Sequence, residues 1–173
     1  IYSYFSTVHN PNLPYIYYSN TIGHRFYVVT QWIVGEVVHG PLSKEEVFRA
    51  WDGLSEIHKS FANNHFSVHT TLLDKINECQ ITGSQAIKKL GNLILNLLPL
   101  SMEDDVPVFY DLHRDNYIRT QEGWKLVDIE GVLMAPAEFS AACFMAAFLM
   151  LENPNLDISP YYSLLSGKSF DIN

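Results

Sequence analysis

The stretch VPVFYDLHRDNYIRTQEGWKLVDIEG, residues 106–131, decides how the rest of the chain is interpreted. A short strand leads into a polar loop, and Gln121-Glu122-Gly123 is a turn signal between two strand-like segments. The pattern predicts a β-hairpin over residues 117–128. Its second strand is expected to end in Asp128 and to return this residue beside Asn116.

Three side chains in this stretch share metal and proton chemistry: Asp111, Asn116 and Asp128. The first two are five residues apart on one loop, and Asp128 follows twelve residues after Asn116. Carboxylate and amide oxygens are ligands that Mg²⁺ accepts while it keeps several waters. The spacing matches phosphoryl transfer, in which a loop Asp accepts the acceptor's proton while an Asn and a second Asp bind Mg²⁺. The simpler alternative is that Asp111 and Asn116 only satisfy backbone donors of the loop.

Composition and charge limit the kinds of partner that the chain can have. Its 173 residues are 47% hydrophobic and 17% charged, which is enough for one domain with a sizeable core. The net charge of −8 argues against nucleic-acid binding and modestly favours a cationic substrate. No apolar run has the length of a membrane span, and no signal peptide is visible, so the cytoplasm is the expected compartment. Cys79 and Cys143 are expected to be reduced core thiols, and no segment indicates an oligomeric state.

The flanking segments predict an α+β fold, with strands first and helices through the middle. Ser43 and Glu46 form a capping-box pattern that begins a helix running to about Ala62, with His58 as a packing residue near its end. Strands are predicted over Pro14–Ser19 and Phe26–Ile33. Further helices are predicted over Thr70–Gln80, Ser84–Leu98 and Ala137–Leu151, the last of them fully buried, with a final helical turn around Tyr161–Leu165.

Several of these segments resemble one enzyme family. Residues 111–116, DLHRDN, resemble the D-L-H-P-G-N part of the catalytic loop in aminoglycoside phosphotransferases and choline-kinase-like enzymes. Residues 127–130, VDIE, are similar to the I-D-W/F-E segment of that family, and residues 135–142, APAEFSAA, to its G-P-x-E-F-D-L-A run. Upstream, residues 27–35, YVVTQWIVG, resemble the hinge strand that contacts adenine, and residues 54–58, LSEIH, resemble a helix end common in the family.

The resemblance implies a protein-kinase-like fold with a mainly helical large lobe. Residues 1–34 would be the last strands of the N-terminal lobe and the hinge, and residues 35–173 the C-terminal lobe with the catalytic hairpin. It further implies transfer of the γ-phosphoryl group of ATP, with Mg²⁺, to a hydroxyl of a small molecule such as an aminoglycoside or an amino alcohol. The alternative is a catalytically silent kinase-like binding domain, or an inactive fragment without the lobe that clamps the nucleotide.

Position by position, the resemblance makes Asp111 the catalytic base and Asn116 and Asp128 the Mg²⁺ ligands. Glu130 would be a supporting acidic residue near the metal or the substrate. His113 would shape the loop or face the phosphates, and a packing role for its imidazole is an equal alternative.

The hinge residues are assigned in the same way. The resemblance implies that the backbone of Gln31, Trp32 and Ile33 holds the adenine edge.

The chain also departs from the family pattern. Phe109 replaces a His, so the hydrogen bond that braces the loop must come from elsewhere. Arg114-Asp115 replaces Pro-Gly and adds a charge pair beside Asn116, and Ser140 replaces an Asp that anchors the loop. The first Lys of the chain is Lys44, after the hinge, so the family's Gly-rich loop and phosphate-clamping Lys are not found in this chain. The expectation is either a fragment of a longer protein, or a pseudokinase or split protein.

Overall fold

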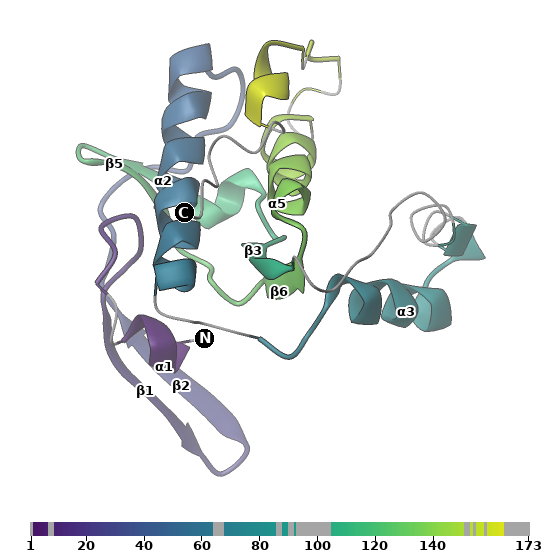
Figure 1. Cartoon of the computed structure of the whole chain (residues 1–173). Helices are drawn as coiled ribbons and strands as arrows, with labels where there is room; N and C mark the ends of the chain where they lie inside the picture. The colour runs from purple at the N-terminus through teal and green to yellow at the C-terminus, as the bar shows by residue number, and fades with distance from the viewer. Residues whose placement is uncertain are drawn as a thin grey trace.

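The computed structural model describes residues 2–6, 9–63, 68–85, 88–89, 92, 105–150, 153, 155–157 and 159–164. The described elements are α1 (Tyr2–Phe5), β1 (Ile16–Ile22), β2 (Arg25–Thr30), α2 (Lys44–Asn63), α3 (Leu72–Thr82), β3 (Val106–Phe109), the 3₁₀ helix η2 (Arg114–Asn116), β4 (Tyr117–Thr120), β5 (Gly123–Leu126), β6 (Val132–Ala135), α5 (Ala137–Cys143), the π-helix η3 (Phe144–Met150) and the 3₁₀ helix η4 (Ser159–Leu164). Figure 1 shows α3 set apart from α2 and α5, and α1 beside the β1–β2 hairpin; the strands of the described residues form short pairs.

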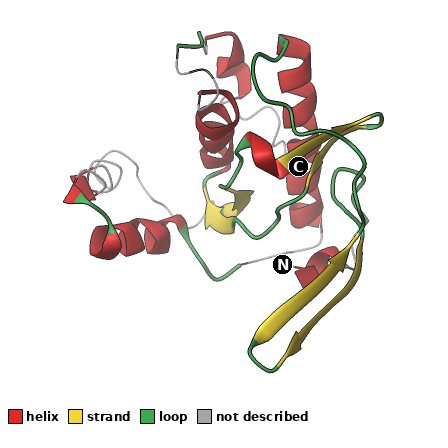
Figure 2. Cartoon of the chain, turned by 180° about the vertical axis from the view of Figure 1, so that it is seen from behind, coloured by secondary structure: helices red, strands yellow, loops and turns green. Residues whose placement is uncertain are grey.

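The strands of the described residues form three antiparallel pairs, β1–β2, β3–β6 and β4–β5. The predicted α+β class is therefore confirmed. The first pair is a hairpin that extends away from α2 and α5 (Figure 2). Its turn lies at Gly23-His24, because Gly23 adopts φ 64°, a left-handed conformation that glycine accepts without a steric cost. Strand β1 thus continues to Ile22, beyond the predicted end at Ser19.

Local signals place the starts of the two long helices. The amide of Glu46 donates to Ser43 Oγ over 3.2 Å, and the Ser43 amide donates to Glu46 Oε2 over 2.9 Å, so the predicted capping box of α2 is confirmed. Helix α3 begins at Leu72, two residues after the predicted start. The reason is a second capping box, in which Thr71 and Asp74 satisfy each other's backbone amides.

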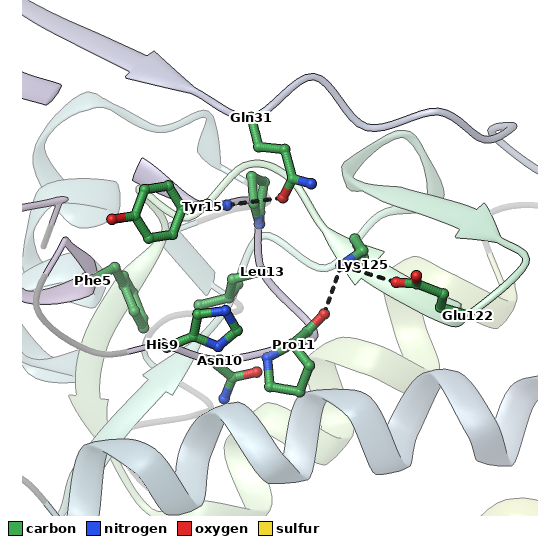
Figure 3. A pocket seen from close by; sticks show the side chains of 10 residues that line it. Phe5, His9, Asn10, Pro11, Leu13, Tyr15, Gln31, Glu122 and Lys125 are labelled. Atoms are coloured by element: carbon green, nitrogen blue, oxygen red, sulfur yellow. Dashed lines mark hydrogen bonds and ion pairs between the residues drawn. The ribbon is translucent and has the colours of Figure 1, made fainter. Parts of the chain in front are cut away.

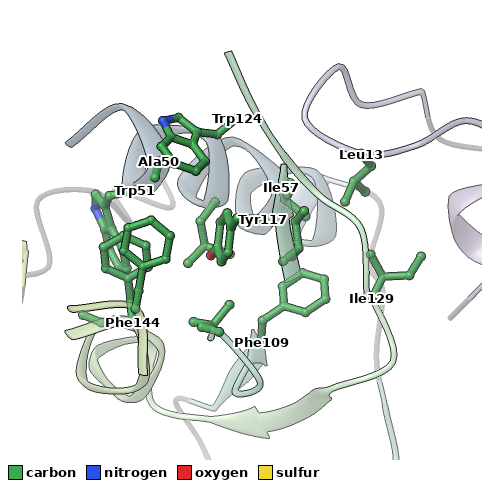
Figure 4. Packing of buried hydrophobic residues seen from close by; sticks show 14 of the residues in the cluster. Leu13, Ala50, Trp51, Ile57, Phe109, Tyr117, Trp124, Ile129 and Phe144 are labelled. Carbon is green, nitrogen blue, oxygen red and sulfur yellow. The ribbon is translucent and has the colours of Figure 1, made fainter. Parts of the chain in front are cut away.

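The main core lies between α2, the β4–β5 hairpin and η3 (Figure 4). Helix α2 buries one apolar face, which consists of Val47, Trp51, Leu54, Ile57 and Phe61. Aromatic rings fill the centre: Trp51 meets Phe144 edge to face at 5.3 Å, and Tyr117 meets Phe148 at 4.9 Å between centroids. Such offset pairs add to the area that the rings bury. A smaller cluster packs α3 against β3 and β6.

The structure corrects several predictions. Residues 137–150 are helical as predicted, but α5 gives way to a π-helix after Cys143, and Ala142, Ala146 and Met150 lie on an exposed face. The small apolar side chains on that face gave no indication in the sequence that the face would be exposed. Cys79 is exposed and Cys143 half-buried, so Cys79 is not a core thiol.

Neither α1 nor strand β6 was predicted. Strand β6 pairs with β3 in a register that places Val106 opposite Ala135 and Phe109 opposite Val132. Most of the helix predicted over residues 84–98 lies outside the described residues. Within the described ranges, no helix combines the length and the apolar character needed to cross a bilayer.

Candidate functional site

The β4–β5 hairpin forms in the predicted register. Tyr117 lies opposite Leu126, and the Val127 amide donates to the Asn116 carbonyl over 2.8 Å, which extends the pairing one step beyond the strands. Strand β5 itself ends at Leu126, two residues before the predicted end at Asp128. The hairpin therefore brings the backbone around Asp128 back to the level of Asn116.

Asn116 closes the polar loop. Its side-chain amide donates from Nδ2 to the Asp111 carbonyl over 2.9 Å, and the residue is buried with 6% exposure. The donor half of the amide is thus used within the loop, and the oxygen is the half that remains for a cation. This contact satisfies a backbone acceptor, whereas the simpler alternative has Asn116 satisfying backbone donors. The contact does not conflict with metal binding through Oδ1.

Asp111 lies against the segment that follows the hairpin. The Tyr110 amide donates to the Gly131 carbonyl over 2.9 Å. A Cβ atom on Gly131 would come within 2.8 Å of the Asp111 Cβ, closer than real Cβ atoms approach. Only glycine fits at residue 131 without displacing Asp111. The Asp111 side chain is half exposed, so its carboxylate is accessible from solvent.

Asp128 and Glu130 lie on the same exposed segment. Asp128 Oδ1 accepts the Glu130 amide over 3.3 Å, and Glu130 Oε1 accepts the Tyr2 hydroxyl over 3.1 Å. Partial burial, that hydrogen bond and the charges of Glu130 and Asp128 all raise the pKa of Tyr2. Tyr2 of α1 is therefore a neighbour of both carboxylates, a contact that nothing in the sequence indicated.

The donor set suits a cation that keeps water in its shell. Among the described residues, no group of three or more His, Cys, Asp and Glu side chains is arranged to hold a metal ion. Asn116 Oδ1 and the Asp128 carboxylate are hard oxygen donors, and Mg²⁺ is commonly bound by one or two protein oxygens plus waters and phosphates. The pair fits Mg²⁺ better than it fits a metal that requires a closed cage of protein ligands.

The backbone of Phe109 is braced by two buried polar residues. Its amide donates to His58 Nε2 over 3.3 Å, and its carbonyl accepts the Ser140 hydroxyl over 3.2 Å. Helices α2 and α5 thus hold strand β3 just before the loop, which supplies the hydrogen bond that Phe109 cannot make with its own side chain. The prediction that His58 packs rather than reacts agrees with its 5% exposure.

The burial of His58 predicts a pH dependence of stability. Burial lowers its pKa to about 3, whereas an unfolded His titrates near 6.5. The unfolded chain then binds a proton that the folded chain excludes, so stability falls as pH drops from about 6.5 towards 3. Between pH 7 and pH 5 this group should cost about 2 kcal/mol of unfolding free energy.

Urea unfolding at both pH values measures this loss, and a His58→Gln variant serves as the matched control. Gln keeps an acceptor for the Phe109 amide but does not titrate, so its stability should change less with pH than that of the wild type. Equal pH dependence in the two proteins would contradict the assignment.

Arg114 points inward and anchors the loop to the helices. Its exposure is 4%, its Nε donates to the Phe148 carbonyl over 2.6 Å, and its Nη1 donates to the Gly40 carbonyl. The guanidinium also lies over the Phe148 ring at 5.3 Å. The two charged residues beside Asn116 therefore face different ways. Asp115 points outward, with its oxygens 3.5 Å from His39 Nε2 and 3.6 Å from His113 Nδ1.

His113 lies between two carboxylates. Its Nε2 is 3.3 Å from Asp111 Oδ1, on the side opposite Asp115. Of the two alternatives for this residue, the loop-shaping role has the more specific contacts.

The hinge residues line a shallow pocket with the turn of the β4–β5 hairpin. Gln31, Trp32 and Ile33 form one wall, and Thr120, Gln121, Glu122 and Lys125 form the other. Trp32 is 86% exposed. The Gln31 amide donates to the Tyr15 carbonyl over 2.7 Å, so it continues the β1–β2 ladder and is not left for a ligand. Of the three residues predicted to hold the adenine edge, Trp32 and Ile33 have backbone amides that lie beyond the β1–β2 ladder.

The hinge docks onto the hairpin through Gly35 and Glu36. Glu36 and Arg119 exchange both backbone hydrogen bonds, at 3.0 and 2.9 Å. A side chain on Gly35 would overlap the Arg119 carbonyl and the Ile118 side chain. The two segments that the sequence links to nucleotide and metal binding are therefore joined by direct backbone pairing.

A second hollow lies between the hinge and the loop that precedes β1 (Figure 3). Its volume is about 640 Å³ including the open mouth, and Leu13, Gln31 and Lys125 are among the residues that line it. Lys125 Nζ donates to the Pro11 carbonyl over 2.8 Å, so the ammonium group has a structural partner. This hollow contains none of the residues that the sequence assigned to catalysis.

Compared with protein-family models, curated proteins and solved structures, the chain matches none of them.

Proposed function

We propose that the chain is the hinge and large lobe of a kinase-like phosphotransferase that acts on a hydroxyl of a small molecule. The observation that carries the proposal is the convergence of two distant segments. Asn116 closes the loop onto the Asp111 carbonyl, and Val127 pairs with Asn116. Gly131 lets the backbone after Asp128 pack directly on Asp111. A base and two hard oxygen donors thereby lie on adjacent backbone.

In the proposed reaction, Asp111 orients the acceptor hydroxyl and accepts its proton. The acceptor oxygen forms a bond to the γ-phosphorus of ATP as the bond from that phosphorus to the bridging oxygen breaks. Asn116 and Asp128 would hold Mg²⁺, which when bound neutralises charge on the phosphates. Glu130, held by the Tyr2 hydroxyl, would lie at the edge of this site.

The charge of the site bears on the acceptor. Asp111, Asp115, Asp128 and Glu130 are exposed acidic residues on adjacent segments, and the net charge of the chain is −8. A hydroxylated amine, such as an amino alcohol or an aminoglycoside, suits such surroundings better than an anion does. ATP and Mg²⁺ as reactants are consistent with a cytoplasmic site of action.

A catalytically silent kinase-like domain is the second candidate. Trp32 is almost fully exposed and the Gln31 amide is already bonded, which reduces the backbone offered to a nucleotide. One observation argues against a silent domain. Although Phe109 and Ser140 differ from the family pattern, the backbone of Phe109 is still braced by hydrogen bonds to His58 and Ser140.

Mg-ATP binding tests the proposal on the full-length protein. A ligand that binds only the folded state at a hundred times its Kd adds about 2.7 kcal/mol of stability. For a chain of this size, that free energy raises Tm by about 5–10 °C. We expect such a shift with Mg-ATP, a much smaller one with ATP and EDTA, and loss of the Mg²⁺-dependent part in Asp128→Asn.

The control for this test is Asp52→Asn, which removes an exposed carboxylate of α2 that has no part in the proposed site. It should keep the full shift. No Tm change in the wild type at millimolar Mg-ATP would refute the phosphotransferase proposal. A shift without phosphorylation of any hydroxylated amine would favour the silent domain.

A further inference from the structure

Acidic and imidazole side chains alternate in a line that leads away from Asp111. Asp111 Oδ1 lies 3.3 Å from His113 Nε2, and His113 Nδ1 lies 3.6 Å from Asp115 Oδ2. The other oxygen of Asp115 lies 3.5 Å from His39 Nε2. His39 comes from the segment before α2, so the line joins two parts of the chain that are more than seventy residues apart.

The line is extended, not convergent. Among the described residues, no three His, Cys, Asp and Glu side chains gather around one point as metal ligands would. Instead, the His113 ring lies between the carboxylates of Asp111 and Asp115, and His39 lies against the other oxygen of Asp115. This arrangement suits orientation of one group by the next.

The backbone of Asp111 is fixed by its neighbours. Its carbonyl accepts the Asn116 amide over 2.9 Å, and Gly131 packs against its Cβ. These contacts fix where the side chain starts but not where the carboxylate points. Within the described ranges, the contact recorded for that carboxylate is the one with His113. The direction of the Asp111 oxygens therefore depends on His113.

The far side of the His113 ring faces Asp115. Nδ1 is shielded from solvent and makes no hydrogen bond within the described residues, and Asp115 Oδ2 lies 3.6 Å from it. The His113 side chain is 37% exposed, whereas Asp115 is 67% and His39 58% exposed. Exposed links contribute less than shielded ones, so a substitution of His113 should have a larger effect than a substitution of Asp115 or His39.

We propose that His113 is a positioning residue that aims the Asp111 carboxylate at the acceptor hydroxyl, with Asp115 and His39 holding its ring from behind. This inference rests on the proposed function, because it assumes that Asp111 meets the acceptor. It goes further by giving a role to His113 and to Asp115, which the family resemblance leaves open.

Steady-state kinetics of the full-length protein with Mg-ATP and a hydroxylated amine tests the role. His113→Ala should lower kcat by about tenfold to a hundredfold, because small displacements of a reacting group cost about that much. KM for ATP and for the amine should stay within about twofold, since neither is bound through His113. His113→Gln, which keeps a donor near the position of Nε2, should recover most of the lost rate.

The remaining substitutions test the order along the line. Asp115→Ala should lower kcat by about two- to fivefold alone and should add nothing to His113→Ala, because coupled residues are not additive. His24→Ala, which removes an exposed imidazole at the β1–β2 turn, is the matched control and should behave as wild type. The proposal is overturned if His113→Ala keeps at least half of kcat, if Gln is no better than Ala, or if the loss is mainly in KM.

A spectroscopic measurement separates this inference from the proposed function. The ¹³C carboxyl resonance of Asp111, assigned by its loss in Asp111→Asn, should move in His113→Ala and not in His24→Ala. If the wild type is inactive but the resonance moves, the proposed function fails and the contact between His113 and Asp111 stands. An unchanged resonance in a folded His113→Ala protein overturns the inference, whatever the activity.

Discussion

Replacing Asp111 with Asn is expected to lower the rate of phosphoryl transfer by about a hundredfold to ten-thousandfold. Asn keeps the size and a hydrogen-bonding oxygen of the side chain but cannot accept the proton of the acceptor hydroxyl. KM for ATP should change little, because Asn116 and Asp128, not Asp111, are the proposed metal ligands. Coupled measurement of ADP release with a hydroxylated amine gives both constants.

The fold should tolerate this change. The Asp111 side chain is half exposed, and Asn116 bonds the Asp111 backbone carbonyl rather than its side chain. Thermal unfolding of Asp111→Asn should therefore resemble that of the wild type, and Asp52→Asn should retain full activity. An Asp111→Asn protein that is folded and turns over at the wild-type rate would rule out Asp111 as the base.

Arg114→Ala is expected to lower the free energy of unfolding by about 2–5 kcal/mol, the largest stability effect that we predict for the site. The substitution removes the two hydrogen bonds that the guanidinium donates to the Phe148 and Gly40 carbonyls, and a hydrogen bond to a charged group contributes about 1.5–3 kcal/mol. It also removes the cation that lies over the Phe148 ring. Urea unfolding measures the loss.

Two variants separate the causes. Arg114→Met fills the volume but donates nothing, so it should be nearly as unstable as Arg114→Ala if the hydrogen bonds dominate. Arg49→Ala removes an exposed Arg that pairs with Glu45 one turn away, and a surface pair of this kind contributes little. If Arg114→Ala is as stable as Arg49→Ala, the anchoring role of Arg114 is wrong.

The parts of the site that local sequence encodes were predictable. A turn signal between two strand-like segments is sufficient to give the β4–β5 hairpin, and a capping box is sufficient to start α2. The register of the hairpin then returns the backbone near Asp128 to Asn116. No contact with distant residues was required for either conclusion.

The parts that depend on distant residues were not predictable. Strand β6 pairs with β3 only because residues far apart in the chain meet, and its short apolar sequence has no turn signal of its own. Arg114 and Asp115 place two adjacent charges beside Asn116 in the sequence. In a 3₁₀ helix, however, neighbours point in different directions, and Arg114 turns inward to Phe148 while Asp115 faces His39. Likewise Tyr2, a neighbour of Glu130, lies 128 residues away from it in the chain.

The contact between Arg114 and Phe148 also matters for the helix that receives it. Phe148 lies in the last turn of η3, where peptide dipoles sum to a partial negative charge and a cation is favourable. The loop that carries Asp111 thus acts as the cap of a helix more than thirty residues further along the chain. Loop and helix end should therefore open together as one cooperative unit, so that amide exchange in the last turn of η3 reports on the integrity of the loop.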